Sequence, residues 1–202
     1  VVHVVGTGTV GEPLIGLLVN MREPLGIDEV TFHKRTPLIT DRSKVINLMK
    51  RGARLAVDES AQKGFRDLGI EPAYEHHEAL RQASVVIDCT PSKVGLQNKT
   101  EFYEKYRDNT LGFVAQGSEF GFGKMYARGI NESALLKGQD QFVQVVSCNT
   151  HNLSVLVDVI ALQDGGPENL VEGRFVCIRR ANDISQDGSF VPSPQVGGHK
   201  DV

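Results

Sequence analysis

A cysteine stands where an apolar, strand-like stretch gives way to helix-starting residues, in the segment VVSCNTHNL at residues 145–153. This junction predicts that Cys148 lies at a helix N-terminus, where the helix dipole favours a thiolate over a thiol. A thiolate is a nucleophile, so the position suits covalent catalysis. The alternative is a buried structural cysteine, the usual state of a free thiol and our expectation for Cys89 and Cys177.

The residues after Cys148 predict a helix over residues 150–163, with Asn149 and Thr150 as suitable capping side chains. Apolar side chains recur there at the spacing of one helical face, at Leu153, Leu156, Val157 and Ile160.

A second chemical signal lies at the start of the chain, where the β-branched run VVHVV leads into GTGTVG and then into an apolar helical pattern. In such a strand–turn–helix, Gly6 would permit the tight turn, Gly8 the approach of a pyrophosphate, and Gly11 close packing of helix on strand. Pro13 suits a first helical turn. The pattern predicts a dinucleotide site; the alternative is a glycine-rich turn that binds nothing.

The turn after the second predicted strand reads HKRTP and contains no carboxylate. An acid at this point commonly binds the ribose diol of NAD. Lys34, Arg35 and Thr36 instead offer cationic and hydroxyl donors that suit the 2′-phosphate of NADP. The alternative is a solvated basic turn.

Strand and helix patterns alternate along the first three quarters of the chain, which predicts a doubly wound parallel α/β sheet. We expect strands at residues 1–5, 29–34, 53–57, 84–89, 110–115 and 142–147, and helices at residues 40–51, 59–68, 76–82 and 99–106. Residues 117–138, rich in glycine, predict a long or poorly ordered loop. His76 and His77, flanked by acids, predict a solvated helix face rather than ligands.

Composition narrows the function class. The 202 residues are 40% hydrophobic and 23% charged with a net charge of -3, as in an ordinary globular chain without the basic footprint of a nucleic-acid or membrane binder. No apolar run suits a membrane helix and no secretory leader is evident, so we expect a cytoplasmic protein. Three cysteines without Cys-x-x-Cys spacing suggest neither a disulfide framework nor a metal site.

Several stretches together resemble the archaeal-type (type II) glyceraldehyde-3-phosphate dehydrogenases. They are GTGTVG, KRTP, VVIDCTPSKVG, QGSE, VVSCNT, IRRAND, FVPSP and HKDV. VVSCNT followed by the RRA stretch is the most specific part.

The resemblance covers essentially the whole chain and implies a Rossmann nucleotide domain at residues 1–146. Residues 147–202 would be the opening part of an α+β catalytic domain, too short for a core of its own. The chain starts within a strand and ends without a cap signal, so we expect a fragment.

The resemblance implies a cytoplasmic homotetramer of glycolysis or gluconeogenesis that uses NADP or NAD. The thiolate of Cys148 would attack glyceraldehyde 3-phosphate, the hemithioacetal would lose hydride to the nicotinamide, and inorganic phosphate would cleave the thioester to give 1,3-bisphosphoglycerate. Substrate contacts would come from Ser147 and Asn149, with phosphate ligands among Thr150, Arg179, Arg180 and His199. Either arginine is also a candidate cofactor ligand. The cofactor would contact Thr9, Val10, Thr90, Pro91 and Gly117.

The sequence departs from the family at two places. His151 follows Thr150, where the family usually has threonine or a small residue, and closeness along the chain does not make it the base. The family's own general base would lie beyond Val202. GGHKD keeps one histidine of the family's His-His-Ala-Lys-Asp stretch, which puts the phosphate site in question. A semialdehyde dehydrogenase is one alternative, and a non-catalytic nucleotide-binding or redox-sensing module is another.

Overall fold

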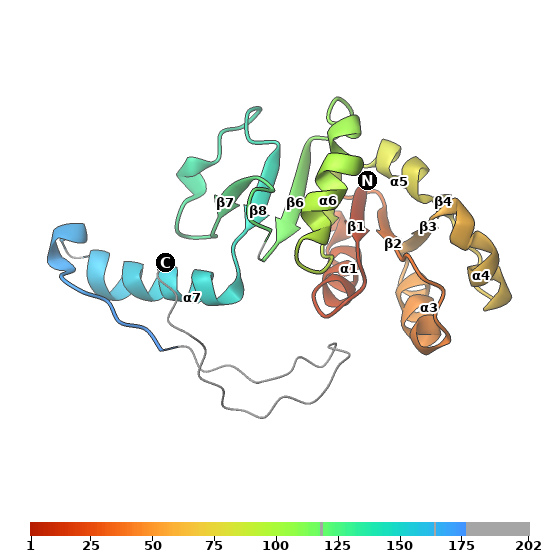
Figure 1. Cartoon of the computed structure of the whole chain (residues 1–202), viewed down its shortest axis with the longest axis horizontal. Helices are drawn as coiled ribbons and strands as arrows, with labels where there is room; N and C mark the ends of the chain where they lie inside the picture. The colour runs from red at the N-terminus through yellow and green to blue at the C-terminus, as the bar shows by residue number, and fades with distance from the viewer. Residues whose placement is uncertain (118, 164, 177–202) are drawn as a thin grey trace.

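The computed structural model describes residues 1–117, 119–163 and 165–176, and its centre is a parallel sheet of eight strands in the order β4-β3-β2-β1-β5-β6-β8-β7 (Figure 1). The strands are β1 (Val2–Val5), β2 (Val30–His33), β3 (Arg54–Val57), β4 (Tyr74–Glu75), β5 (Val85–Asp88), β6 (Gly112–Gln116), β7 (Lys124–Tyr126) and β8 (Phe142–Val145). Every pairing between neighbours is parallel. The predicted doubly wound α/β architecture is confirmed.

Helices lie in most connections between strands, as parallel pairing requires. The α-helices are α1 (Gly11–Asn20), α2 (Arg22–Leu25), α3 (Arg42–Lys50), α4 (Gln62–Asp67), α5 (His76–Gln82), α6 (Val94–Glu101) and α7 (Cys148–Val157). The short 3-10 helices are η1 (Ile39–Asp41), η2 (Glu59–Ala61), η3 (Tyr103–Tyr106), η4 (Glu132–Ala134) and η6 (Pro167–Asn169), and a π-helical turn, η5 (Asp158–Leu162), extends α7. None of the described helices is long and apolar enough to cross a membrane.

Two hydrophobic clusters lie on opposite faces of the sheet. One joins β1, β2 and β3 to buried residues of α1, α3 and α4, among them Ile15, Leu48 and Phe65. The other is aromatic and contains Tyr103 and Phe113, whose rings stack 5.4 Å apart. Because side chains alternate between the faces of a strand, β1 supplies both clusters, with Val2 and Val4 in the first and Val5 in the second.

The helix expected at residues 99–106 is placed wrongly. In the structure α6 begins earlier, at Val94, and η3 follows it. The buried carboxylate of Glu119 fixes this start, because it accepts from the backbone N–H groups of Lys93 at 2.5 Å and Leu96 at 2.9 Å. Lys93 holds a left-handed φ of 74° at the same point. A cap delivered from a distant loop leaves no local pattern in the helix itself.

Residues 117–138 are not only a loop, which corrects the sequence-based prediction. They contain the edge strand β7 and the short helix η4. Gly123 permits the close approach of β7 to β8, since a Cβ there would lie 2.1 Å from the carbonyl oxygen of Phe142. β4, with two residues, was also missed.

A buried carboxylate ties the end of β5 to the elements that follow it. Asp88 is 1% exposed and accepts from Thr90 at 2.5 Å, from Asn98 at 2.9 Å and from the hydroxyl of Tyr103 at 2.5 Å. Burial, with the nearby Asp88 carboxylate, raises the pKa of Tyr103 well above its usual range, so the phenol remains a hydrogen-bond donor.

We therefore expect Asp88→Ala to lower the free energy of unfolding by about 3 kcal/mol or more, because it leaves several buried donors without an acceptor. Tyr103→Phe removes one donor and should cost only about 1–2 kcal/mol. Urea titration followed by circular dichroism measures both. A loss below about 1 kcal/mol in Asp88→Ala would show that the carboxylate does not organise this corner.

Candidate functional site

The glycine turn after β1 has the geometry expected of a dinucleotide site. Gly6 has a φ of +97°, and a Cβ on it would lie 2.9 Å from the carbonyl oxygen of Cys89. A Cβ on Gly11 would lie 2.0 Å from the carbonyl oxygen of Gly6. These two glycines therefore permit the tight turn and the close packing of α1.

Gly8 differs from its neighbours, because a Cβ there would meet nothing within 4 Å. The backbone at Gly8 thus faces open space, as a turn that receives a pyrophosphate must. Val10 precedes α1 and supplies no side-chain cap for the helix start. The turn fits a dinucleotide, and these N–H groups would hold its phosphates.

The other predicted cofactor residues follow neighbouring strands at the same edge of the sheet. Thr90 and Pro91 come after β5, Gly117 after β6 and Cys148 after β8. Strands β1, β5, β6 and β8 are consecutive neighbours, so the structure brings these turns to one edge, the lower one in Figure 1. Ligands of open parallel sheets bind at this carboxyl edge.

The basic turn after β2 is partly neutralised by an acid that sequence analysis missed. The ammonium group of Lys34 lies 2.5 Å from the carboxylate of Asp41, and Lys44 of α3 lies 3.4 Å from it. The hydrogen bond from Lys34 lowers the pKa of Asp41, so this carboxylate is charged at neutral pH. Asp41 stands seven residues after Lys34, beyond the HKRTP turn, and only the fold brings them together.

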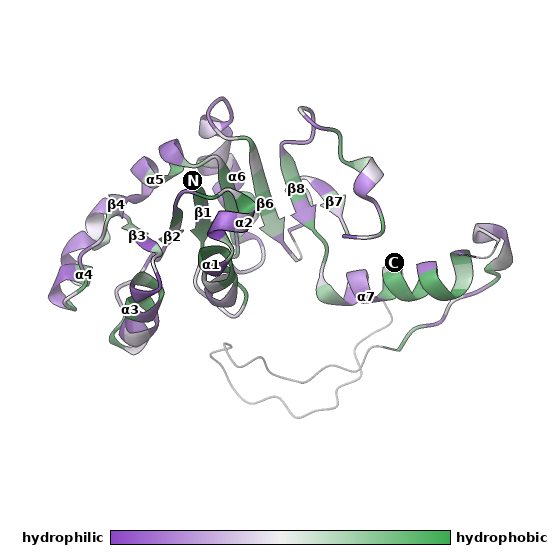
Figure 2. Ribbon diagram, turned by 180° about the vertical axis from the view of Figure 1, so that it is seen from behind, coloured by the Kyte–Doolittle hydropathy of each residue, from purple (hydrophilic) through white to green (hydrophobic). Residues whose placement is uncertain are grey.

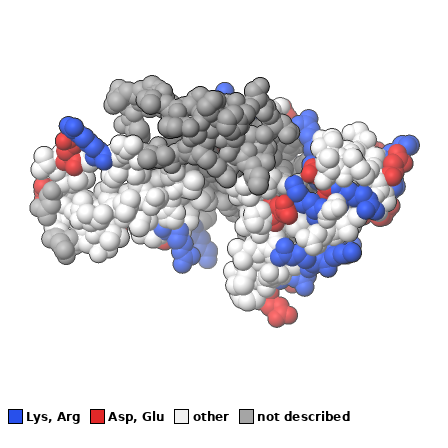
Figure 3. Space-filling model, turned by 90° about the horizontal axis from the view of Figure 1, so that it is seen from below, with Lys and Arg blue, Asp and Glu red and all other residues white. Residues whose placement is uncertain are grey.

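Lys44 also reaches the glycine turn. Its Nζ lies 3.5 Å from the carbonyl oxygen of Thr7 and 3.9 Å from the carboxylate of Glu12. Seen along the carboxyl edge, Lys and Arg side chains gather, with acidic ones among them, on the side where α3 and α4 lie (Figure 3). Lys34, one of the cations expected to meet a 2′-phosphate, thus belongs to a mixed charge network.

Cys148 is the first residue of α7, and the helix begins two residues earlier than predicted. Ser147, rather than Asn149 or Thr150, is the capping residue: its Oγ accepts from the backbone N–H of Thr150 at 3.2 Å. The Thr150 hydroxyl lies 2.9 Å from the same oxygen. The Asn149 side chain lies beside the thiol, with its Oδ1 3.9 Å from Sγ.

The described cysteines have opposite environments. Cys89 is 7% exposed, and burial raises the pKa of its thiol to about 12, so it is inert at neutral pH. Cys148 is exposed. Cys177 lies outside the described residues, as do Arg179, Arg180 and His199, and their predicted roles remain predictions.

His151 is engaged away from the thiol by a contact that the sequence does not reveal. Its Nε2 lies 2.8 Å from the carbonyl oxygen of Arg128, which fits an N–H donated to that oxygen. A nitrogen that donates in this way cannot take a proton, which leaves Nδ1 as the acceptor of the His151 ring.

The prediction of a solvated face is wrong for His76. It is 5% exposed, and its ring stacks on that of His33 with centroids 3.8 Å apart. Burial lowers the pKa of His76 to about 3, so the ring is neutral. His77, the next residue, is partly buried, and its Nδ1 lies 2.8 Å from the hydroxyl of Tyr106. His33 and His3 face α5 from the sheet, which no local pattern reveals.

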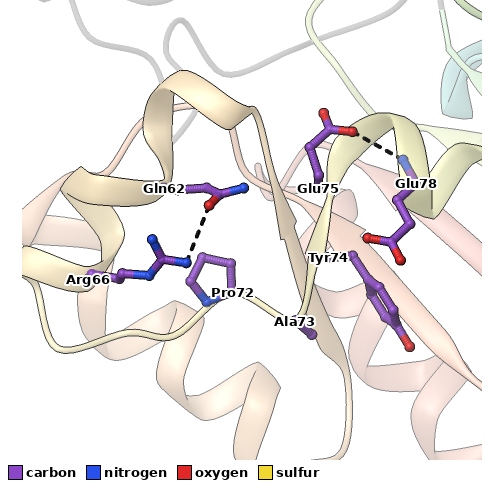
Figure 4. Close-up of a pocket in the computed structure, with 7 residues that line it drawn as sticks. All are labelled: Gln62, Arg66, Pro72, Ala73, Tyr74, Glu75 and Glu78. Atoms are coloured by element: carbon purple, nitrogen blue, oxygen red, sulfur yellow. Dashed lines mark hydrogen bonds between the residues drawn. The ribbon is translucent and has the colours of Figure 1, made fainter.

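A hollow of about 210 Å³ lies at the far end of the sheet, beside β4, and contains no predicted site residue (Figure 4). Two hydrogen bonds join groups within the hollow: Arg66 donates to Gln62 at 3.3 Å, and Glu75 accepts from the backbone N–H of Glu78 at 3.2 Å. Residues that line it are Gln62, Arg66, Pro72, Ala73, Tyr74, Glu75 and Glu78. Five strands lie between β4 and β8 in the strand order, so the hollow is separate from the Cys148 site.

Comparison with known proteins gives one consistent name. The chain is 28% identical over 198 residues to the glyceraldehyde-3-phosphate dehydrogenase of Pyrobaculum islandicum, covering 96% of this chain and 54% of the relative. It is 30% identical over 152 residues to that of Methanobrevibacter smithii, covering 69% and 40%. It is 28% identical over 201 residues to that of Methanocaldococcus jannaschii, covering 94% and 53%. No family model matches the chain.

These relatives support the family resemblance found in the sequence motifs. The chain spans about half the length of the curated relatives it matches. The substrate named for these relatives, glyceraldehyde 3-phosphate, is therefore only a proposal for this chain.

Helix α7 extends away from the sheet and is largely apolar in Figure 2. The expected single apolar face is not packed on the described residues: none of the α7 side chains is buried, and Leu156 remains 40% exposed. Ile160, in the turn that extends the helix, is 78% exposed. An apolar helix beside a nucleotide domain is a surface that further structure commonly covers.

The glycine geometry gives a matched pair of tests. We expect Gly8→Ala to keep the free energy of unfolding within about 1 kcal/mol of the parent protein, because its Cβ enters open space. The same change should weaken dinucleotide binding about tenfold or more, since that space would receive the pyrophosphate. Calorimetric titration and urea unfolding measure the two effects.

Gly11→Ala is the control, expected to cost about 3 kcal/mol because its Cβ would overlap the Gly6 carbonyl. If Gly8→Ala bound the dinucleotide as well as the parent protein does, the turn would not be the pyrophosphate site.

Proposed function

We propose that this chain is the nucleotide domain and the start of the catalytic domain of a phosphorylating glyceraldehyde-3-phosphate dehydrogenase of the archaeal type. The observation that carries the proposal is the exposed thiol of Cys148 at the first position of α7, at the sheet edge where the glycine turn lies. The similarity to dehydrogenases over nearly the whole chain supports it.

In the proposed reaction the Cys148 thiolate adds to the aldehyde carbon and forms a hemithioacetal. The carbonyl oxygen gains negative charge in this step, and the first N–H groups of α7 would stabilise it. When bound, the nicotinamide accepts the hydride that leaves the hemithioacetal carbon. The resulting thioester remains attached to Cys148.

Inorganic phosphate then attacks the thioester carbon, the carbon–sulfur bond breaks, and the thiolate returns. The products are free enzyme and 1,3-bisphosphoglycerate, which is an acyl phosphate. Covalent capture on Cys148 divides one difficult transfer into two easier ones. Ser147, Asn149 and Thr150 would contact the substrate, and Asn149 already lies beside the thiol. The phosphate ligands are proposed at Arg179, Arg180 and His199.

The cofactor would lie along the same edge, with its pyrophosphate at the turn formed by Gly6, Gly8 and Gly11. Thr90, Pro91 and Gly117 would line the nicotinamide end. Lys34, Arg35 and Thr36 would meet the 2′-phosphate of NADP, with NAD as the weaker ligand.

The domain division follows the same proposal. Residues 1–146 would form the nucleotide domain, and residues 147–202 would open the catalytic domain. The apolar surface of α7 supports this, because further catalytic structure would cover it. The family also suggests a cytoplasmic homotetramer in glycolysis or gluconeogenesis, with the general base outside this sequence.

The first test is the fate of Cys148. Iodoacetamide should alkylate it much faster than Cys89, which is buried with a raised pKa, and peptide mass mapping resolves the two sites. In the full-length protein Cys148→Ser should abolish turnover and leave the dissociation constant for the cofactor unchanged. Appreciable turnover of this variant would rule out the covalent mechanism.

Substrate and phosphate dependence separate this function from its alternatives. The full-length protein should turn over NADP and glyceraldehyde 3-phosphate repeatedly only when phosphate or arsenate is present, because either anion cleaves the thioester. Without these anions, reduction should stop at one equivalent per Cys148. Steady-state absorbance at the reduced cofactor band follows the reaction. Activity with a semialdehyde alone would favour the related dehydrogenase, and no activity with any aldehyde would favour a binding module.

The basic turn predicts cofactor preference. Each charge-assisted hydrogen bond contributes about 1.5–3 kcal/mol, but solvent and Asp41 offset part of this at Lys34, so we expect about a tenfold preference for NADP. The double variant Lys34→Ala, Arg35→Ala should raise the dissociation constant for NADP and leave that for NAD nearly unchanged.

Lys63→Ala is the matched control, since this lysine is exposed on α4 and pairs only with Asp67 among the described ion pairs. Equal losses for NADP and NAD in the double variant would assign the turn to the pyrophosphate or to the fold.

A further inference from the structure

A second group of chemically capable side chains lies at the carboxyl ends of β2, β3 and β4, away from Cys148. His33 ends β2, Asp58 directly follows β3, and His76 begins α5 directly after β4. One ligand atom from each lies within 4.8 Å of the others. The Nε2 of His33 and the Oδ1 of Asp58 are 3.2 Å apart.

Among the residues that the structure describes, two buried nitrogens near this group have no hydrogen-bond partner. Nδ1 of His76, in a residue 5% exposed, is one, and Nε2 of His3, in a residue 0% exposed, is the other. Leaving a buried polar atom unsatisfied is costly, and native structures rarely do so without an unseen water or ion. The Nδ1 of His3 is satisfied by the hydroxyl of Thr31 at 2.7 Å.

We propose that His33, Asp58 and His76 bind one divalent transition-metal ion, with Zn²⁺ the best match. Two imidazoles and one carboxylate are a common zinc ligand set, and a water would complete four-fold coordination. Mg²⁺ and Ca²⁺ fit less well, because both prefer oxygen ligands.

The distance between the ligand atoms of His33 and Asp58 already matches the spacing of ligands around a bound ion. Ligand atoms of tetrahedral zinc lie roughly 3.3 Å apart, given zinc–nitrogen bonds of about 2.0 Å. The His33–Asp58 pair is at 3.2 Å, so only His76 needs to move in. Its ring is tilted 27° from that of His33, and rotation about the Cβ–Cγ bond would direct a nitrogen lone pair toward the ion.

An entry path and a second shell are present as well. The side chain of Asp58 is 37% exposed, so an ion can reach the group from solvent. The ring of His3 lies 5.5 Å from that of His76, centroid to centroid, and its free Nε2 would face the bound water. The ion would join the ends of three neighbouring strands and stiffen the approach to Lys34.

The competing explanation is a His33–Asp58 hydrogen bond with buried water on the two free nitrogens. It needs no ion and accounts for the 3.2 Å distance equally well. The two explanations differ in one respect: only the first predicts saturable binding of a metal that requires all three side chains.

Calorimetric titration of ZnCl₂ into EDTA-treated protein tests this in a Cys148→Ser, Cys177→Ser background, which removes two thiols that also bind zinc. We expect one ion per chain with a micromolar or tighter dissociation constant, and a melting temperature raised by about 5 °C at saturation. Asp58→Asn and His76→Gln should each weaken binding at least tenfold.

His77→Gln is the matched control, because His77 neighbours His76 on α5 but points to Tyr106. It should bind zinc as the parent protein does. Since His76→Gln removes a buried ring, the half-exposed Asp58→Asn variant tests the site without disturbing the core.

Nitrogen NMR of the histidine rings gives a reading without any substitution in the site. Zinc should shift the ring signals of His33 and His76 and leave that of His77 in place. Absence of one-to-one binding, equal affinity in Asp58→Asn, or shifts confined to other histidines would overturn the proposal and leave buried water as the occupant.

Discussion

The common direction of the eight strands is the constraint on which the candidate site depends. Parallel pairing forces every strand to end at one edge, so the turns after β1, β5, β6 and β8 meet there although they are far apart in sequence. Close backbone packing fixes this edge further. Gly11 lies against the carbonyl oxygen of Gly6, and Gly6 lies against Cys89. This alignment places the exposed thiol of Cys148 at the same edge as the glycine turn.

Buried polar groups are hydrogen-bonded in one half of this edge, and some lack partners among the described residues in the other half. Around β5 the carboxylates of Asp88 and Glu119 accept several hydrogen bonds each and hold the start of α6. Around β1 to β4, among the described residues, the buried rings of His3 and His76 each keep a nitrogen without a partner. Satisfied networks define a rigid corner, whereas unsatisfied buried nitrogens indicate a place that a ligand or water completes.

Sequence reasoning found what local pattern encodes and missed what tertiary contacts decide. The glycine turn, the alternation of strands and helices, and Cys148 at a helix start follow from nearby residues. The start of α6 depends on Glu119, the burial of His76 depends on His33, and the partner of Lys34 is Asp41. β4 and β7 have two and three residues, too few to produce a periodic signal.

The central claim is that Cys148 carries the substrate as a thioester, and direct observation of that adduct tests it most sharply. The full-length protein is mixed with glyceraldehyde 3-phosphate and NADP in phosphate-free buffer, quenched in acid, digested and mapped by mass spectrometry. We predict a phosphoglyceroyl group on the Cys148 peptide that disappears when phosphate is added before the quench. An unmodified Cys148 peptide alongside stoichiometric cofactor reduction, or the acyl group on Cys89 or Cys177, would contradict the account.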